Sequence, residues 1–64
     1  MELYKVPKNT DIIVKNVPNR EKGTIEDWRL HFHHVDGMYS YCTDPEHNDE
    51  VVHLAAWTDV ELAT

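Results

Sequence analysis

Residues 30–43 read LHFHHVDGMYSYCT, and this stretch decides the fold. Apolar and polar residues alternate on both sides of Asp36-Gly37, as they do in β-strands, where successive side chains point to opposite faces. An Asp-Gly pair between two such segments is the strongest short-range signal of a β-hairpin, because glycine adopts positive φ freely and aspartate tolerates it. The sequence therefore predicts two antiparallel strands joined by a two-residue turn at Asp36-Gly37.

A turn at this place fixes which residues face one another across the hairpin. Val35 then faces Met38, and the pairing continues outward to His31 and Cys42. One face should be the aromatic one and look into the core, and it is predicted to hold Leu30, Phe32, His34, Tyr39 and Tyr41. The opposite face is predicted to hold His31, His33, Val35, Met38, Ser40 and Cys42.

The chain before the hairpin contains one clear strand. Residues 12–14 are three consecutive β-branched residues, which favour extended backbone. Residues 16–26 are mostly polar and include Pro18 and Gly23, so we expect a long loop there.

The chain after the hairpin contains two more short strands. Residues 50–54 predict a strand that pairs back onto residues 38–43. Residues 55–58 are too few for a stable α-helix and suit one turn of 3-10 helix. Residues 59–62 alternate polar and apolar and predict a last short strand.

This order of elements resembles an SH3-like barrel. We therefore expect an all-β fold, a small SH3-like barrel of about five short antiparallel strands with a 3-10 turn before the last strand. A single domain should cover residues 1–64, with an N-terminal segment at 1–10 and the barrel at 11–63. The chain lacks the Ala-Leu-Tyr-Asp-Tyr segment and the paired tryptophans of signalling SH3 domains, so the resemblance does not imply proline-peptide binding.

A second resemblance concerns the segments at residues 34–42 and 52–57, which are similar to small uncharacterised proteins of marine bacteriophages. That resemblance implies no activity. No apolar core of a signal peptide follows Met1, and the longest apolar run, residues 54–57, is far too short to span a membrane. We expect a soluble protein with no membrane association, located in the cytoplasm, including that of a phage-infected host.

Charge is distributed unevenly along the chain. The formal net charge is −6, yet all six Lys and Arg residues lie at or before Arg29. Residues 30–64 carry seven acidic residues and no Lys or Arg. Such a field repels a phosphate backbone, which binds through Lys and Arg, so we expect no nucleic-acid partner.

His31, His33 and Cys42 form the first candidate site. Two histidines in a His-x-His pattern on a strand lie on one face, about 6.6–6.8 Å apart, and Cys42 is predicted opposite His31. Imidazole and thiolate are ligands of Zn²⁺, so these three residues are a candidate zinc site. The same face could instead be covered by a partner, with Val35 and Met38 beside His31 and His33 as the interface, or be an ordinary exposed face.

The small size of the chain bears on both alternatives. Sixty-four residues form a small core, and Cys42 is the only cysteine, so no disulfide supplements it. A metal or a partner is then the usual source of extra stability. Nucleophilic catalysis requires a nucleophile together with an orienting group and an oxyanion hole, and the sequence does not indicate the complete set. We therefore expect no enzyme and no catalytic residues. The sequence favours a non-enzymatic interaction or self-assembly module, acting as a homo-oligomer or with a protein partner; the alternative is a metal-binding domain.

Overall fold

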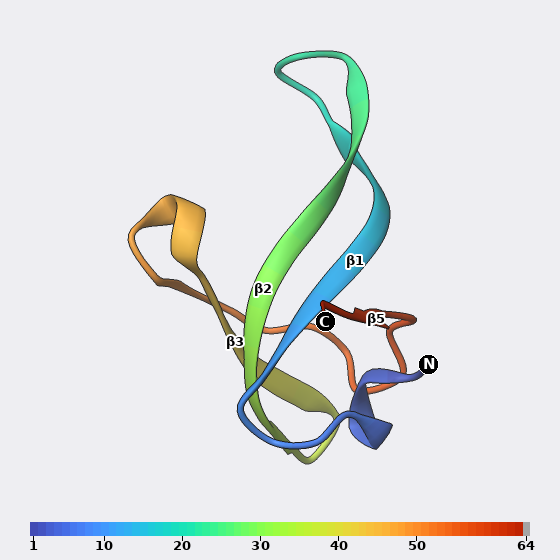
Figure 1. The fold of residues 1–64 in the computed structure, drawn as a ribbon, viewed down its shortest axis with the longest axis vertical. Helices are drawn as coiled ribbons and strands as arrows, with labels where there is room; N and C mark the ends of the chain where they lie inside the picture. Colours follow the sequence, from blue (N-terminus) through green and yellow to red (C-terminus); the bar gives the residue numbers. More distant parts are fainter. Residues whose placement is uncertain (64) are drawn as a thin grey trace.

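Five antiparallel strands form one sheet in the order β4-β3-β2-β1-β5 in this computed structural model, which describes residues 1–63 (Figure 1). The strands are β1 (Thr10–Asn19), β2 (Thr24–Asp36), β3 (Tyr39–Asp44), β4 (Glu50–Val52) and β5 (Glu61–Leu62). Two 3-10 helices accompany them, η1 (Leu3–Lys5) and η2 (Pro45–His47). The all-β class is confirmed, although the sheet is open, because β4 and β5 are its two edges and do not pair. None of the helices in residues 1–63 has the length and apolar character needed to cross a membrane.

The predicted turn before the last strand is present. Thr58 N–H donates to the Ala55 carbonyl at 3.0 Å, which is the i to i+3 hydrogen bond of a 3-10 turn. The strand before it is shorter than predicted, since β4 ends at Val52.

The long loop expected at residues 16–26 is wrong, because that stretch is most of a β-hairpin. Strands β1 and β2 pair as far as Asn19 and Thr24, with a bulge between Val14 and Val17. The Asn19 side chain closes the end, where its Oδ1 accepts from the backbone N–H groups of two loop residues at 3.1 and 3.2 Å. Gly23 supplies the positive φ of +66° that the connection requires. The end of this hairpin extends away from the rest of the molecule (Figure 1).

The central hairpin, β2–β3, is present, but its turn lies one residue later than predicted. Asp36 pairs with Tyr39, so the two turn residues are Gly37 and Met38. Gly37 has a φ of +64° and Met38 does not have positive φ, the pattern of a type II′ turn with glycine first. The predicted pairing of Val35 with Met38 is therefore wrong, and Val35 pairs with Ser40 instead.

A β-bulge at His33 changes the faces of β2 as well. Phe32 pairs with Cys42 and His34 with Tyr41, so His33 is an extra residue between the two pairs. Because one extra residue reverses the side to which the side chains after it point, three of the five residues predicted for the core face are misplaced. Leu30 and Phe32 are in the core as predicted, whereas His34, Tyr39 and Tyr41 lie on the other face.

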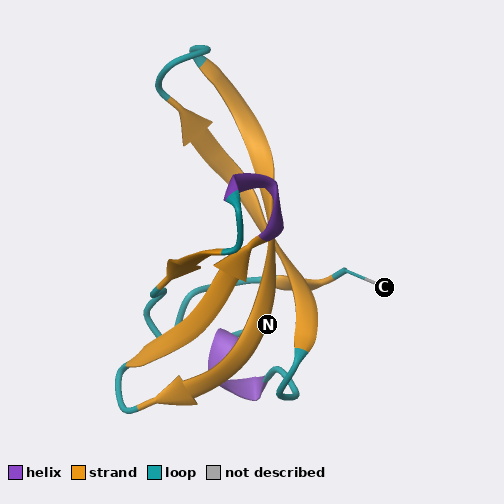
Figure 2. Ribbon diagram, turned by 90° about the vertical axis from the view of Figure 1, so that its left-hand side faces the viewer, coloured by secondary structure: helices purple, strands orange, loops and turns teal. Residues whose placement is uncertain are grey.

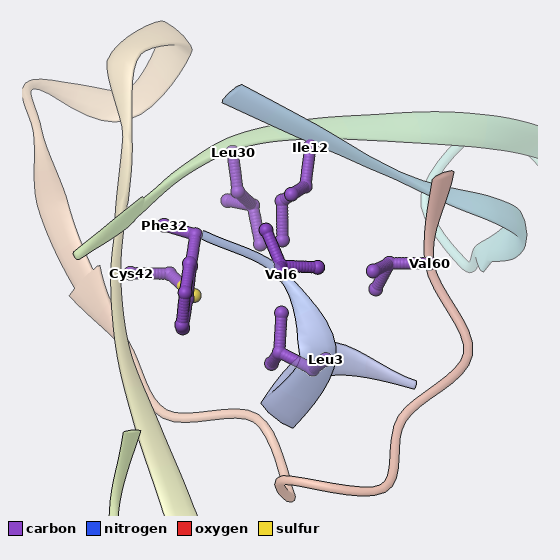
Figure 3. Packing of buried hydrophobic residues seen from close by; sticks show 7 residues of the cluster. All are labelled: Leu3, Val6, Ile12, Leu30, Phe32, Cys42 and Val60. Atoms are coloured by element: carbon purple, nitrogen blue, oxygen red, sulfur yellow. The ribbon is translucent and has the colours of Figure 1, made fainter. Parts of the chain in front are cut away.

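The core fills the enclosed side of the sheet. Its buried cluster is shown in Figure 3 and consists of Leu3, Val6, Ile12, Leu30, Phe32, Cys42 and Val60. Two members come from the N-terminal segment that we expected to precede the barrel. Leu3 N–H donates to the Thr58 carbonyl and Tyr4 N–H to the Ala56 carbonyl, both at 2.9 Å, so η1 is bound to the turn before β5. Figure 2 shows η1 lying within the curve of the strands.

Candidate functional site

The face of the sheet opposite the core carries a layer of exposed and half-buried rings. The bulge at His33 puts them there, because the extra residue sends His34 and the tyrosines of β3 to the side of the sheet opposite Phe32. His53, which follows β4, joins them through contact with Tyr41. We call this surface the histidine–tyrosine face, and it consists of His31, His33, His34, Tyr39, Tyr41 and His53.

One end of this face is organised by Asp11. Its carboxylate accepts a hydrogen bond from His31 Nδ1 at 2.7 Å across the β1–β2 pair. Because an ionised carboxylate can only accept, the proton of neutral His31 lies on Nδ1, and Nε2 is left as an acceptor. The rings of His31 and His33 meet edge to face, with centroids 5.1 Å apart. The two predicted histidines are thus together, as their spacing indicated.

The other end is organised by Tyr41. The His34 ring stacks on Tyr41 with centroids 4.8 Å apart and planes at 15°, and His53 contacts Tyr41 edge to face at 4.8 Å. His53 Nδ1 lies 3.1 Å from the Ser40 carbonyl oxygen, which can only accept, so Nδ1 carries the proton and Nε2 is an acceptor in the neutral ring. An open hollow of about 370 Å³ is lined by Asp36, Tyr39, Tyr41 and His53.

Cys42 is not part of this face. Its side chain is fully buried and lies in the core beside Phe32 (Figure 3). Burial raises the pKa of the thiol, an effect that the Ser40 hydroxyl at 3.5 Å only partly offsets. The placement of Cys42 opposite His31 is wrong, since Thr43 is the residue that pairs with His31. The structure therefore separates the thiol from the two imidazoles of the candidate zinc site, and within residues 1–63 no group of three or more His, Cys, Asp or Glu residues is arranged to hold a metal.

The predicted interface residues are also divided by the structure. His31 and His33 lie on the histidine–tyrosine face, but Val35 is half-buried and packs against the core. Met38 is 62% exposed in the turn at the end of the hairpin. The physical reason is the bulge at His33, whose extra residue moves Val35 to the core side and places His34 and Tyr41 on the outer face.

A buried carboxylate lies on the opposite side of the sheet, at the end of β3. Asp44 is only 3% exposed, and its Oδ2 accepts from Trp28 Nε1 and from His47 Nδ1, each at 2.8 Å. Its Oδ1 accepts from the Glu46 backbone N–H at 3.0 Å, which caps η2. Burial acts most strongly and raises the pKa of Asp44, but the three hydrogen bonds together outweigh it and leave that pKa below its usual value.

The capping of η2 by Asp44 is the one part of this cluster that has a signal in the sequence. Aspartate followed by proline is a typical start of a short helix, because the side chain caps the first turn and proline fits its first position. The groups around Asp44 join η2 to the base of the β1–β2 hairpin. We interpret the cluster as structural, since each oxygen of the carboxylate is occupied by a group of this chain.

No family model, curated protein or solved structure matches the chain. What it does must therefore be argued from its own side chains. The side chains of Ser40 and Cys42 face the core, and the Ser40 hydroxyl is engaged with Leu54, donating to its carbonyl at 2.9 Å and accepting from its N–H at 3.1 Å. The exposed groups of the histidine–tyrosine face are imidazole and phenol rings with carboxylates at its ends. These groups bind by stacking, by hydrogen bonds and by attraction of cations.

Proposed function

We propose that this protein is a non-enzymatic interaction module that binds a protein partner through the histidine–tyrosine face. The observation that carries the proposal is the layer of rings itself. Tyr39 and Tyr41 are 56% and 40% exposed, and Tyr41 is held between two imidazoles. Tyrosine is enriched at protein interfaces because it provides a large, rigid contact area and a polar end.

The charge of the molecule favours a basic partner over a second copy of the chain. Each copy carries a formal net charge of −6, so two copies repel one another near neutral pH. Residues 30–64, which supply every residue of the histidine–tyrosine face, contain no Lys or Arg. A basic protein meets this surface with complementary charge, which speeds association and selects against acidic partners.

The test is selection of ligands from a displayed library of random peptides. We expect the wild-type protein to enrich peptides rich in Lys or Arg, and the double variant His34→Ala/Tyr41→Ala to lose them. Tyr4→Ala is the matched control, since Tyr4 is 55% exposed on η1, away from this face. It should enrich the same peptides as the wild type.

Two results would contradict the proposal. One is enrichment that survives in the double variant while its far-UV circular dichroism remains that of the wild type. The other is sedimentation equilibrium at neutral pH that shows a stable homodimer broken by the same double substitution, because the face would then bind a second copy.

A further inference from the structure

We propose that the hollow between Asp36, Tyr39, Tyr41 and His53 binds the alkylammonium group of a lysine side chain presented by the partner. This inference rests on the proposed function and names the group that the face recognises. The hollow has a volume of about 370 Å³, near the lower end of the roughly 300–1,000 Å³ of ligand pockets. The four residues that line it offer two phenol rings, one carboxylate and one imidazole.

The backbone fixes the relative positions of these groups. Asp36 and Tyr39 are directly paired at the two sides of the Gly37-Met38 turn. Tyr41 lies two residues further along β3, so its side chain points to the same face as Tyr39. Contacts with His34 and His53 hold the Tyr41 ring in place. A ligand would therefore meet rings that are already positioned, and little order has to be created on binding.

The charge at the hollow is uncompensated. Among the ion pairs within residues 1–63, Asp36 takes part in none. The only tyrosine in the described chain with a cation over its ring is Tyr4, where Lys5 Nζ lies 5.8 Å from the ring centroid. The phenol rings of the hollow and its carboxylate are thus free to attract a cation from outside, the first through their negative faces and the second through its charge.

The imidazole of His53 should distinguish a primary ammonium from a quaternary ammonium. Because His53 Nδ1 donates to the Ser40 carbonyl, Nε2 of the neutral ring is a hydrogen-bond acceptor. An ammonium group that carries N–H bonds can donate to it, whereas a quaternary ammonium cannot. We therefore expect a primary ammonium to bind more tightly than a quaternary ammonium of similar size.

The experiment is a titration of the full chain with n-butylammonium, a mimic of the lysine side chain, followed by two-dimensional NMR. We expect saturable shifts centred on the four lining residues. Asp36→Asn should weaken binding about two- to fivefold, the range for exposed ion pairs. Tyr39→Leu should weaken it by a similar factor.

Three controls isolate the cause. Asp49→Asn and Tyr4→Leu remove an exposed carboxylate and an exposed phenol elsewhere and should leave the affinity for n-butylammonium unchanged. n-Pentanol has nearly the same size without the charge and should not shift the four residues. The dispersion of the NMR spectrum shows that each variant remains folded.

Opposite results would overturn the inference. Equal shifts with n-pentanol would show an apolar site, and equal or tighter binding of tetramethylammonium would remove the role of His53. A peptide from the library that binds the histidine–tyrosine face equally well after Lys→norleucine replacement would overturn the lysine site and leave the proposed function standing. If the library yields no peptide whose binding depends on the histidine–tyrosine face, both the lysine site and the proposed function are contradicted.

Discussion

Asp44 shows how one residue can change its role between sequence and structure. In the sequence it begins a run of acidic and polar residues that reads as solvated loop, yet its carboxylate is buried and receives three hydrogen bonds. No local pattern indicates that Trp28, sixteen residues earlier, points its indole N–H at this position. The contact exists because β2 and β3 pair side by side, and local sequence does not show which distant side chains this pairing brings together.

Replacement of Asp44 by asparagine should destabilise the fold. The amide has a single acceptor oxygen and no charge, and hydrogen bonds to charged groups contribute about 1.5–3 kcal/mol each. We expect the free energy of unfolding to fall by about 1–3 kcal/mol near pH 7, measured by urea denaturation with far-UV circular dichroism. Asp49→Asn, at an exposed site, is the control and should have a negligible effect.

The effect of Asp44→Asn on the free energy of unfolding should also depend on pH. The pKa of Asp44 is lowered in the folded state, so the carboxylate stabilises the fold above the unfolded value of about 3.9, and this contribution is lost as the pH falls through the lower folded pKa. The difference in unfolding free energy between wild type and Asp44→Asn should be constant above about pH 5 and shrink toward pH 2. A difference that grows on acidification would contradict this interpretation of Asp44.

At the scale of the element, the bulge at His33 decides which rings form the candidate site. His33 is one extra residue opposite β3, and on the other side of β2 the ladder with β1 has already ended at Phe32 and Thr10. Deletion of His33 would therefore leave Phe32 facing the core and His34 facing outward, in regular alternation. The visible losses are the hydrogen bond from Asn9 N–H to the His33 carbonyl at 3.2 Å and the ring contact with His31 on the surface.

We expect the deletion of His33 to preserve the fold. Loss of one backbone hydrogen bond costs about 1 kcal/mol, which lowers the melting temperature of a domain this small by about 4–8 °C. Deletion of His31 is the matched control, since it would reverse the side to which Leu30 and the preceding residues of β2 point and should abolish folding. Thermal denaturation followed by circular dichroism compares the two. If both deletions unfold the protein, the bulge is required for the fold rather than tolerated by it.

The elements also show where the sequence is informative. Alternation and the Asp-Gly pair predicted the central hairpin, and with it the burial of Leu30 and Phe32. They did not distinguish a turn at Asp36-Gly37 from one at Gly37-Met38, because glycine suits either place. The later turn by itself keeps the same residues on each face; the extra residue at His33, which no local pattern indicates, exchanges Cys42 with Tyr41 between the two faces and so replaces a candidate zinc site by a layer of rings.

At the scale of the whole molecule, an open sheet of this length cannot enclose a core alone. The two edge strands are three and two residues long and lie at opposite ends of the strand order. The N-terminal segment supplies what the sheet lacks, since Leu3 and Val6 are 0% and 6% exposed within the core cluster. Sequence could not indicate this, because a segment of ten residues is too short to show a period from which packing can be inferred.

Leu3 should therefore be essential for stability even though it precedes the sheet. Replacement of a buried leucine by alanine costs about 2–5 kcal/mol, and a domain of this size has a total stability of about 3–10 kcal/mol. We expect Leu3→Ala to be largely unfolded at physiological temperature. Leu62→Ala makes the same chemical change at a site that is 39% exposed and should cost much less. Urea denaturation of the two variants gives the comparison, and equal losses would mean that η1 is an appendage of the sheet rather than the part that completes its core.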